Sequence, residues 1–269
     1  MTRTAILLPY YNYPTGLART LESLRGEDQP FDLYIVDDGS RPSLELDTSQ
    51  YPFPVHVVSL TQNNGIEGAL NAGLTQIFSG SYEYIARIDT GDLWLPGRLA
   101  AQADYLDRRP DYVLVGSWVA AFDDNGKDRF VVRYPKTNRA VWKYMAMNSA
   151  FCHPAVMVRA DAWREVGVYA KDFPAAEDYE LFFRLLLRGK GGNLPQVWLR
   201  YEVSANAPSI SYQKRRRQLL SRLKVQLKYF SSASPWAWWG VARTVLLLAI
   251  PYDWVLLLKS RLWRRKASS

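Results

Sequence analysis

Cysteine and histidine are scarce in this chain of 269 residues, which has one cysteine, Cys152, and two histidines. A single cysteine excludes an internal disulfide framework and a cysteine-rich metal site. A secretory signal is also lacking, because no long apolar segment precedes the first strand-like run at residues 5–9. We therefore expect a protein of the cytoplasm.

Long uninterrupted hydrophobic runs are missing as well, although 48% of the residues are hydrophobic. The nearest approach, residues 236–258, is interrupted by Arg243, Pro251 and Asp253. Each charge near the centre of a membrane span costs roughly 2.5–3.5 kcal/mol on insertion. This cost favours helices that lie in the membrane interface over a transmembrane helix, which is the alternative for this segment.

Acidic residues are almost absent from the C-terminal part of the chain. From Gln213 onward there are 13 lysines and arginines and one acid, Asp253, so this segment carries +12 and the rest of the chain −4. Its leucines recur at intervals of three and four residues, Ser234–Pro235 is a helix-start pattern, and five of the ten tryptophans lie here. We predict a basic amphipathic helical tail over 212–269 that meets a polyanionic surface, either a membrane or a nucleic acid.

Strand-like and helix-like segments alternate through the first 120 residues. Apolar strand patterns occupy 5–9, 33–36, 55–58, 84–86 and 112–115, and helical patterns occupy 15–25 and 65–78. This alternation predicts an α/β fold with a mostly parallel sheet covered by helices on both faces. The residues that follow the strands, which are Pro9, Asp37–Asp38, Asn63–Asn64 and Asp89 to Asp92, should then meet at one edge of the sheet.

Residues 121–211 have a less regular pattern. They predict an antiparallel strand at 129–134, a helix at 139–147, a short strand at 155–158 and a helix at 175–187. The last helix has an acidic beginning at Glu177–Asp178 and a glycine just past its end, at Gly189.

Spaced carboxylates end the fourth strand pattern, in the run Ala86-Arg87-Ile88-Asp89-Thr90-Gly91-Asp92. Mg²⁺ and Mn²⁺ prefer oxygen ligands and bind together with a substrate diphosphate, so one or two protein carboxylates suffice. Asp89 and Asp92 are therefore candidate metal ligands, and a solvated turn is the alternative interpretation.

Several short motifs, taken in order, resemble one enzyme family. They are Leu7 to Asn12, Val36 to Ser40, Asn63 to Gly65 with Ala69 to Gly73, Ala86 to Asp89, His153 to Met157, and Ala176 to Tyr179. In this order and spacing they resemble family 2 of the glycosyltransferases over residues 4–205. The resemblance implies a GT-A fold, a nucleotide-sugar donor, a divalent cation (Mg²⁺ or Mn²⁺) and inversion at the anomeric carbon.

The resemblance also divides the chain into functional parts. Residues 1–211 are expected to form the GT-A domain, with a nucleotide-sugar half at 1–120 and an acceptor half at 121–211, followed by the tail. The implied activity is sugar transfer to a glycan or lipid-linked glycan in the assembly of a surface polysaccharide such as O-antigen, lipopolysaccharide, capsule or exopolysaccharide. The implied location is peripheral, at the cytoplasmic face of the inner membrane.

Roles for individual residues follow from the same resemblance. Asp178 is the expected general base, and Glu177 is expected to position the substrate. The alternative interpretation is that both acids only complement the dipole of the helix that they begin. The expected substrate-binding residues are Pro9, Tyr11, Asn12, Asp37, Asp38, Asn64, Asn71, Arg87, His153 and Glu177. Arg87 is alternatively a structural ion-pair partner, and His153 a buried histidine with satisfied hydrogen bonds.

One position departs from the family pattern. Relatives commonly read Asp-x-Asp-Asp where this chain has Asp89-Thr90-Gly91-Asp92, and the missing middle acid is often the direct metal ligand. The pattern therefore does not decide whether Asp89 or Asp92 contacts the cation.

Two other kinds of protein fit parts of the sequence. A nucleic-acid-binding protein without transfer activity would use the basic tail, but the tryptophans of the tail suit a bilayer better, so no nucleic acid is expected. A sugar nucleotidyltransferase would usually carry a Gly-rich basic loop after the first strand, and Pro9 to Gly16 lacks one.

Overall fold

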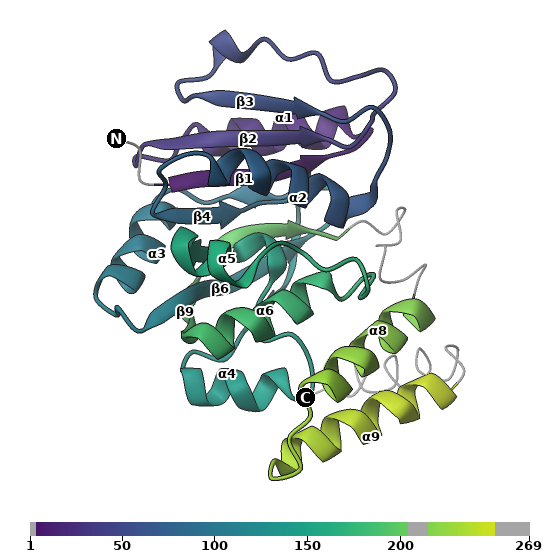
Figure 1. Cartoon of the computed structure of the whole chain (residues 1–269). Coiled ribbons are helices and arrows are strands. Elements are labelled where there is room, and N and C mark those ends of the chain that lie inside the picture. The colour runs from purple at the N-terminus through teal and green to yellow at the C-terminus, as the bar shows by residue number, and fades with distance from the viewer. Residues whose placement is uncertain (1–3, 204–214, 251–269) are drawn as a thin grey trace.

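A nine-stranded mixed sheet forms the body of the protein (Figure 1). The computed structural model describes residues 4–203 and 215–250. The strand order is β3-β2-β1-β4-β8-β6-β9-β5, and β7 pairs with β6. The strands are β1 Thr4–Tyr10, β2 Phe31–Asp37, β3 Val55–Ser59, β4 Tyr84–Arg87, β5 Leu93–Trp94, β6 Tyr112–Phe122, β7 Asp128–Val132, β8 Met157–Arg159 and β9 Lys190–Glu202.

The predicted parallel arrangement is confirmed for β1 to β4, and the complete sheet is mixed. Strands β3, β2, β1 and β4 run parallel to one another, as do β6 and β9. Strand β8 lies antiparallel between β4 and β6, whereas β5 and β7 pair antiparallel with β9 and β6. The sequence missed β9, because Gly191, Gly192 and Pro195 interrupt the alternating pattern that identifies a strand.

Helices cover both faces of the sheet, as predicted. They are α1 Pro14–Leu24, α2 Gly65–Phe78, α3 Arg98–Asp107, α4 Asn138–Met145, α5 Ala160–Val166, α6 Glu177–Arg188, α8 Arg215–Lys228 and α9 Pro235–Ala249. Short 3₁₀ turns occupy Thr48–Gln50 and His153–Ala155.

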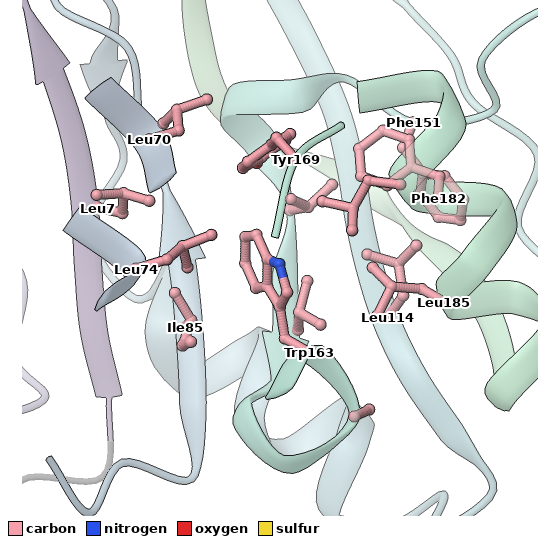
Figure 2. Close-up of a cluster of buried hydrophobic side chains, with 14 of the residues drawn as sticks. Leu7, Leu70, Leu74, Ile85, Leu114, Phe151, Trp163, Tyr169, Phe182 and Leu185 are labelled. Atoms are coloured by element: carbon pink, nitrogen blue, oxygen red, sulfur yellow. The ribbon is translucent and has the colours of Figure 1, made fainter. Parts of the chain in front are cut away.

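The alternation of side chains along each strand divides the core into two clusters. Leu7 belongs to one cluster with Leu74 of α2, Trp163 of α5 and Phe182 of α6, in which Trp163 lies between the α2 side and the α6 side (Figure 2). Its neighbours in β1, Ile6 and Leu8, belong instead to a second cluster with Leu21 of α1 and Leu99 of α3. Because β1 and its neighbours are buried on both faces, the ends of their strands are held rigidly at one edge.

The two tail helices, α8 and α9, lie beside α4 and α6 (Figure 1). A Cβ added to Gly240 of α9 would lie 1.9 Å from the carbonyl oxygen of Ala146, so glycine allows this close approach. As predicted, Ser234 and Pro235 begin α9. No helix in the part of the chain that the structure describes is long and apolar enough to cross a bilayer. Residues 212–214 and 251–269 of the predicted tail lie outside the described residues.

A buried carboxylate fastens α8 to α6. Glu180 is completely buried and accepts hydrogen bonds from Lys228 Nζ at 2.7 Å and from the Tyr229 hydroxyl at 2.8 Å. Arg184, one turn further along α6, donates to its other oxygen at 2.9 Å. The Tyr229 ring also stacks on Phe183, with 4.5 Å between the ring centroids.

Replacing Glu180 should loosen the tail helices. Glu180→Ala removes the shared acceptor of Lys228 and Tyr229, so we expect a loss of about 2–3 kcal/mol in the free energy of unfolding. Urea denaturation measures this loss, and limited proteolysis should cleave within α8 sooner. The control, Glu165→Gln, breaks the half-exposed ion pair with Arg188 and should cost less than about 1 kcal/mol. Equal losses in the two variants would contradict the proposed fastening.

Candidate active site

Two neighbouring aspartates shape the loops at the carboxyl end of β2. Both carboxylate oxygens of Asp37 accept backbone hydrogen bonds at 2.9 Å, one from Ser40 and the other from Leu44. Asp38 accepts a hydrogen bond from the backbone N–H of Asn64 at 2.8 Å, which fixes the start of α2. Burial is the largest cause of the raised pKa of Asp38. The two aspartates therefore hold the rim of the site in place.

The loop after β1 faces the same rim. Asn12 adopts a left-handed backbone conformation with φ of 46°, and its side-chain oxygen accepts from the Arg41 N–H at 2.9 Å. The carbonyl of Pro9 accepts from the Thr90 hydroxyl at 2.7 Å, so the β1 and β4 loops are joined. Tyr11 lies between these two anchored residues and stays 49% exposed, which leaves its ring free to stack on a ligand.

Asn71 lies apart from this rim, in the middle of α2. Its side-chain amide bonds the backbone N–H and carbonyl of Tyr169, both at 2.9 Å. These two hydrogen bonds fasten the segment after α5 to α2. The predicted substrate-binding residue therefore uses its amide group within the protein.

Arg87, at the end of β4, is the central charge of the site. Its side chain is completely buried, and its guanidinium donates to Asp89 at 2.6 Å and to the Ile88 carbonyl at 3.3 Å. It also donates to the His153 ring at 3.3 Å. The ion pair with Asp89 agrees with the interpretation of Arg87 as a structural ion-pair partner.

His153 continues this chain of contacts toward α6. Its Nε2 lies 2.6 Å from the hydroxyl of Tyr169, which is 2% exposed. Burial, followed by the charge of Arg87, holds the pKa of His153 well below its usual range. The ring is therefore a neutral link between the β4 loop and the second half of the chain.

The predicted catalytic pair, Glu177 and Asp178, begins α6. Ala175 just before it has a φ of 62°, a strained conformation for a residue with a side chain. Burial, opposed mainly by the backbone N–H of Tyr179, raises the pKa of Asp178 to about 6. Burial and the charge of Asp178 raise the pKa of Glu177 to about 8. Burial therefore makes both carboxyl groups of the pair harder to ionise than exposed ones.

Asp92, one of the two candidate metal ligands, lies in the loop after β4 and is 2% exposed. One of its carboxylate oxygens accepts from the backbone N–H of Glu202 at 2.9 Å, and the other is buried without a hydrogen-bond partner. Asp89, the other candidate, keeps 35% of its side chain exposed. In residues 4–203 and 215–250, no three His, Cys, Asp or Glu side chains gather closely enough to hold a metal ion by themselves.

The comparisons with known proteins agree with this arrangement. The model for "Glycosyl transferase family 2" matches residues 5–171. The chain is 32% identical to the amylovoran biosynthesis glycosyltransferase AmsE of Erwinia amylovora, over 83% of this chain and 86% of that protein. The chain therefore belongs to glycosyl transferase family 2.

Other relatives of this family 2 member are more distant. It is 26% identical to the UDP-Gal:alpha-D-GlcNAc-diphosphoundecaprenol beta-1,3-galactosyltransferase of Escherichia coli, over 84% of this chain and 82% of that protein. Its fold matches S. aureus TarS 1-349 in complex with UDP-GlcNAc, at a TM-score of 0.66, 16% identity, and coverage of 92% of this chain and 70% of TarS. It also matches the mannosyltransferase PcManGT of Pyrobaculum calidifontis in complex with GDP-Man and Mn²⁺, at a TM-score of 0.60, 16% identity, and coverage of 99% and 75%. These similarities confirm the predicted GT-A fold.

Glu202 explains the glycine that departs from the family pattern. A Cβ added to Gly91 would lie 2.2 Å from the Glu202 Oε2, and Gly91 has a φ of 102°. Glu202 is held there by the Tyr13 hydroxyl, at 2.9 Å, and by Arg19, at 2.5 Å. The carboxylate of this β9 residue thus fills the space that a side chain at position 91 would need.

Sequence reasoning missed both Glu202 and Tyr169. Glu202 ends a strand that the hydrophobic pattern did not reveal. Tyr169 follows α5 without a motif of its own. Gly91 was the available signal for Glu202, because a glycine in place of an expected acid indicates that another group has taken the space.

A side chain at position 91 should destabilise this family 2 member more than one at an open glycine. Gly91→Ala combines the overlap with Glu202 and backbone strain, of which the strain alone costs about 1–3 kcal/mol. Gly126→Ala is the matched control, because Gly126 also has a positive φ, 74°, but a Cβ there meets nothing within 4 Å. Urea denaturation should show the larger loss for Gly91→Ala, and adding Glu202→Ala should recover part of it. Equal losses at the two glycines would refute the overlap.

Proposed function

We propose that this glycosyltransferase transfers a sugar, with inversion, from a nucleoside diphosphate sugar to a hydroxyl of a lipid-linked glycan during assembly of a surface polysaccharide. The main support is the position of Asp178. Arg87 contacts Asp89 on the donor side and also donates to the His153 ring, which lies beside the Tyr169 hydroxyl. The His153 ring contacts Phe182 of α6, and the charge of Asp178 acts on the buried Tyr169. The names of the amylovoran and diphosphoundecaprenol relatives support the acceptor class.

The proposed chemistry requires one carboxylate on the acceptor side. Inversion is a single displacement, in which the acceptor oxygen attacks C1 as the diphosphate leaves on the opposite face. Asp178 accepts the proton of the attacking hydroxyl. Burial and the charge of Asp178 raise the pKa of Glu177, which favours its neutral form and leaves the negative charge of the pair to Asp178. Asp37, Asp38 and Tyr11 form the rim against which the nucleoside would lie, and Asn12 and Asn64 fix that rim.

Asp178→Asn should abolish most of the turnover while donor binding survives. The change is nearly isosteric but removes the proton acceptor, so we expect kcat to fall by about 10²–10⁴. In the wild-type enzyme, kcat/KM should fall as the pH drops below about 6, because the base is then protonated. Asp172→Asn, an exposed aspartate six residues upstream, is the control for both measurements. Turnover of Asp178→Asn within a few-fold of wild type would exclude this base.

A divalent cation on the donor diphosphate is part of the proposal. The two aspartates, Asp89 and Asp92, suit a cation that is shared with the substrate. The side chain of Asp89 is 35% exposed, and one buried carboxylate oxygen of Asp92 has no hydrogen-bond partner among the described residues. A cation bound there would neutralise the leaving diphosphate. Arg87 would hold Asp89 in its orientation, and Glu202 would hold Asp92.

Chelation should then stop the reaction. Transfer should cease with EDTA and return with Mg²⁺ or Mn²⁺. Calorimetry with UDP or GDP, with and without Mn²⁺, measures the same dependence without turnover, and Asp89→Asn should weaken the Mn²⁺-dependent part. Asp104→Asn, on the exposed face of α3, is the matched control. Full activity in EDTA would contradict the role of the cation.

The cytoplasmic face of the inner membrane is the proposed location, reached through the tail. Three apolar side chains of α9, Trp238, Trp239 and Leu246, are 58–59% exposed, and α8 presents Arg216 and Lys224 to solvent. Exposed tryptophans beside basic residues suit the interface of an anionic membrane.

Binding to vesicles tests this location. The full chain should sediment with phosphatidylglycerol vesicles, and salt should weaken the binding, because each lysine or arginine near the surface contributes about 1 kcal/mol. Trp238→Ser with Trp239→Ser should remove much of the salt-resistant part. Equal binding to neutral and anionic vesicles would contradict the electrostatic contribution. Unchanged binding of the double variant would contradict the role assigned to α9.

A further inference from the structure

A cavity of about 800 Å³ is lined by residues of α4, α6, α8 and α9, between the tail helices and the body. Figure 1 shows how these four helices are arranged. None of the residues assigned to the donor or to the base lines the cavity. Its size falls within the range of ligand pockets in proteins, about 300–1,000 Å³. The family match at residues 5–171 ends before α6, so three of the four helices around the cavity lie beyond it.

Aromatic rings form much of the cavity wall. Trp142 of α4, Phe183 of α6, Tyr229 after α8 and Trp236 of α9 all line it. Such a wall provides apolar contact for a hydrocarbon chain. Trp236 itself is 40% exposed and lies on the same helix as the exposed Trp238 and Trp239. The cavity is therefore close to the surface that we assign to the membrane.

Two cations of α4 line the same cavity. Arg139 and Lys143 are four residues apart, so their side chains lie on one face of the helix. Among the described residues that line it there is no aspartate or glutamate. The ammonium of Lys143 lies 3.7 Å from the centroid of the Trp236 ring. The cavity thus joins an apolar wall to positive charge that no lining carboxylate neutralises.

A buried hydrogen-bond acceptor also lines the cavity. Gln226 of α8 is 4% exposed, and its Nε2 donates to the carbonyls of Ala146 and Met147 at 3.3 Å. Its Oε1 is buried and has no hydrogen-bond partner in the part of the chain that the structure describes. A buried acceptor that lacks a partner is costly, and a hydroxyl of an occupant would satisfy it.

We propose that this cavity binds the head of a lipid phosphate. The phosphate lies at Arg139 and Lys143, the first part of the apolar chain lies against Trp142 and Trp236, and a hydroxyl of the head group donates to Gln226. Two sources share this chemistry: a phospholipid of the bilayer, and the lipid phosphate that carries the acceptor glycan. Only the second source rests on the proposed function.

Calorimetry on the full chain tests the site with three probes below their critical micelle concentrations: farnesyl phosphate, farnesol and dihexanoyl phosphatidylglycerol. At least one of the two phosphates should bind about tenfold more tightly than farnesol, because only they engage the cations. Lys143→Gln should weaken phosphate binding about tenfold and leave farnesol unchanged. Lys136→Gln is the matched control, since Lys136 is exposed, close in sequence and outside the cavity lining.

The outcomes separate the sources and the alternatives. Tighter binding of farnesyl phosphate assigns the site to the carrier lipid, and tighter binding of phosphatidylglycerol assigns it to the bilayer. Ala140→Trp, which fills the cavity from α4, should abolish the binding of both phosphates. Equal effects of Lys143→Gln and Lys136→Gln, equal affinity for farnesol, or full binding by Ala140→Trp would each overturn the proposal. Failure of sugar transfer alone would not, because the binding is measured without a donor.

Discussion

The buried guanidinium of Arg87 is the interaction on which the site depends. A charge removed from water must be neutralised and hydrogen-bonded, or its burial is prohibitively costly. Arg87 meets that requirement with Asp89, with the carbonyl of Ile88 and with the ring of His153. Each partner belongs to a segment that must then lie in one place. The loop after β4, which contains Asp89, and the turn before β8, which contains His153, are positioned together because both contact the Arg87 guanidinium.

A second buried arginine, Arg98, supports the first from behind. Its guanidinium donates to the backbone carbonyl of Arg87 at 3.0 Å and lies 4.0 Å from the ring centroid of Trp94. Burial lowers its pKa to about 9, so it is still a cation at neutral pH. The β4 end is thus held from two sides. The loop that we propose to orient the donor diphosphate gains its rigidity from this support.

The tail helices repeat the same principle with opposite charge. Glu180 is a buried anion, and its partners Lys228 and Tyr229 lie near the end of α8. The attachment joins α6, the helix that contains Asp178, to the pair of tail helices, of which α9 carries the exposed tryptophans. It also encloses the cavity lined by Lys143 and Gln226. The proposed base, membrane surface and lipid site are therefore parts of one packed unit.

The sequence by itself determined the parallel strands β1 to β4 and the polar groups that follow their carboxyl ends, because these depend on local patterns. Buried parallel strands require continuous apolar runs, and polar groups such as Asp37 and Asp89 must then follow the strand ends. Only the tertiary structure decided the position of Glu202 over Gly91, the link from Arg87 to Tyr169, and the cavity between α4 and α9. These features join residues far apart in the chain, and their partners are selected by packing and by the neutralisation of buried charge. The local hydrophobic periodicity of the sequence does not reveal which distant residues become partners.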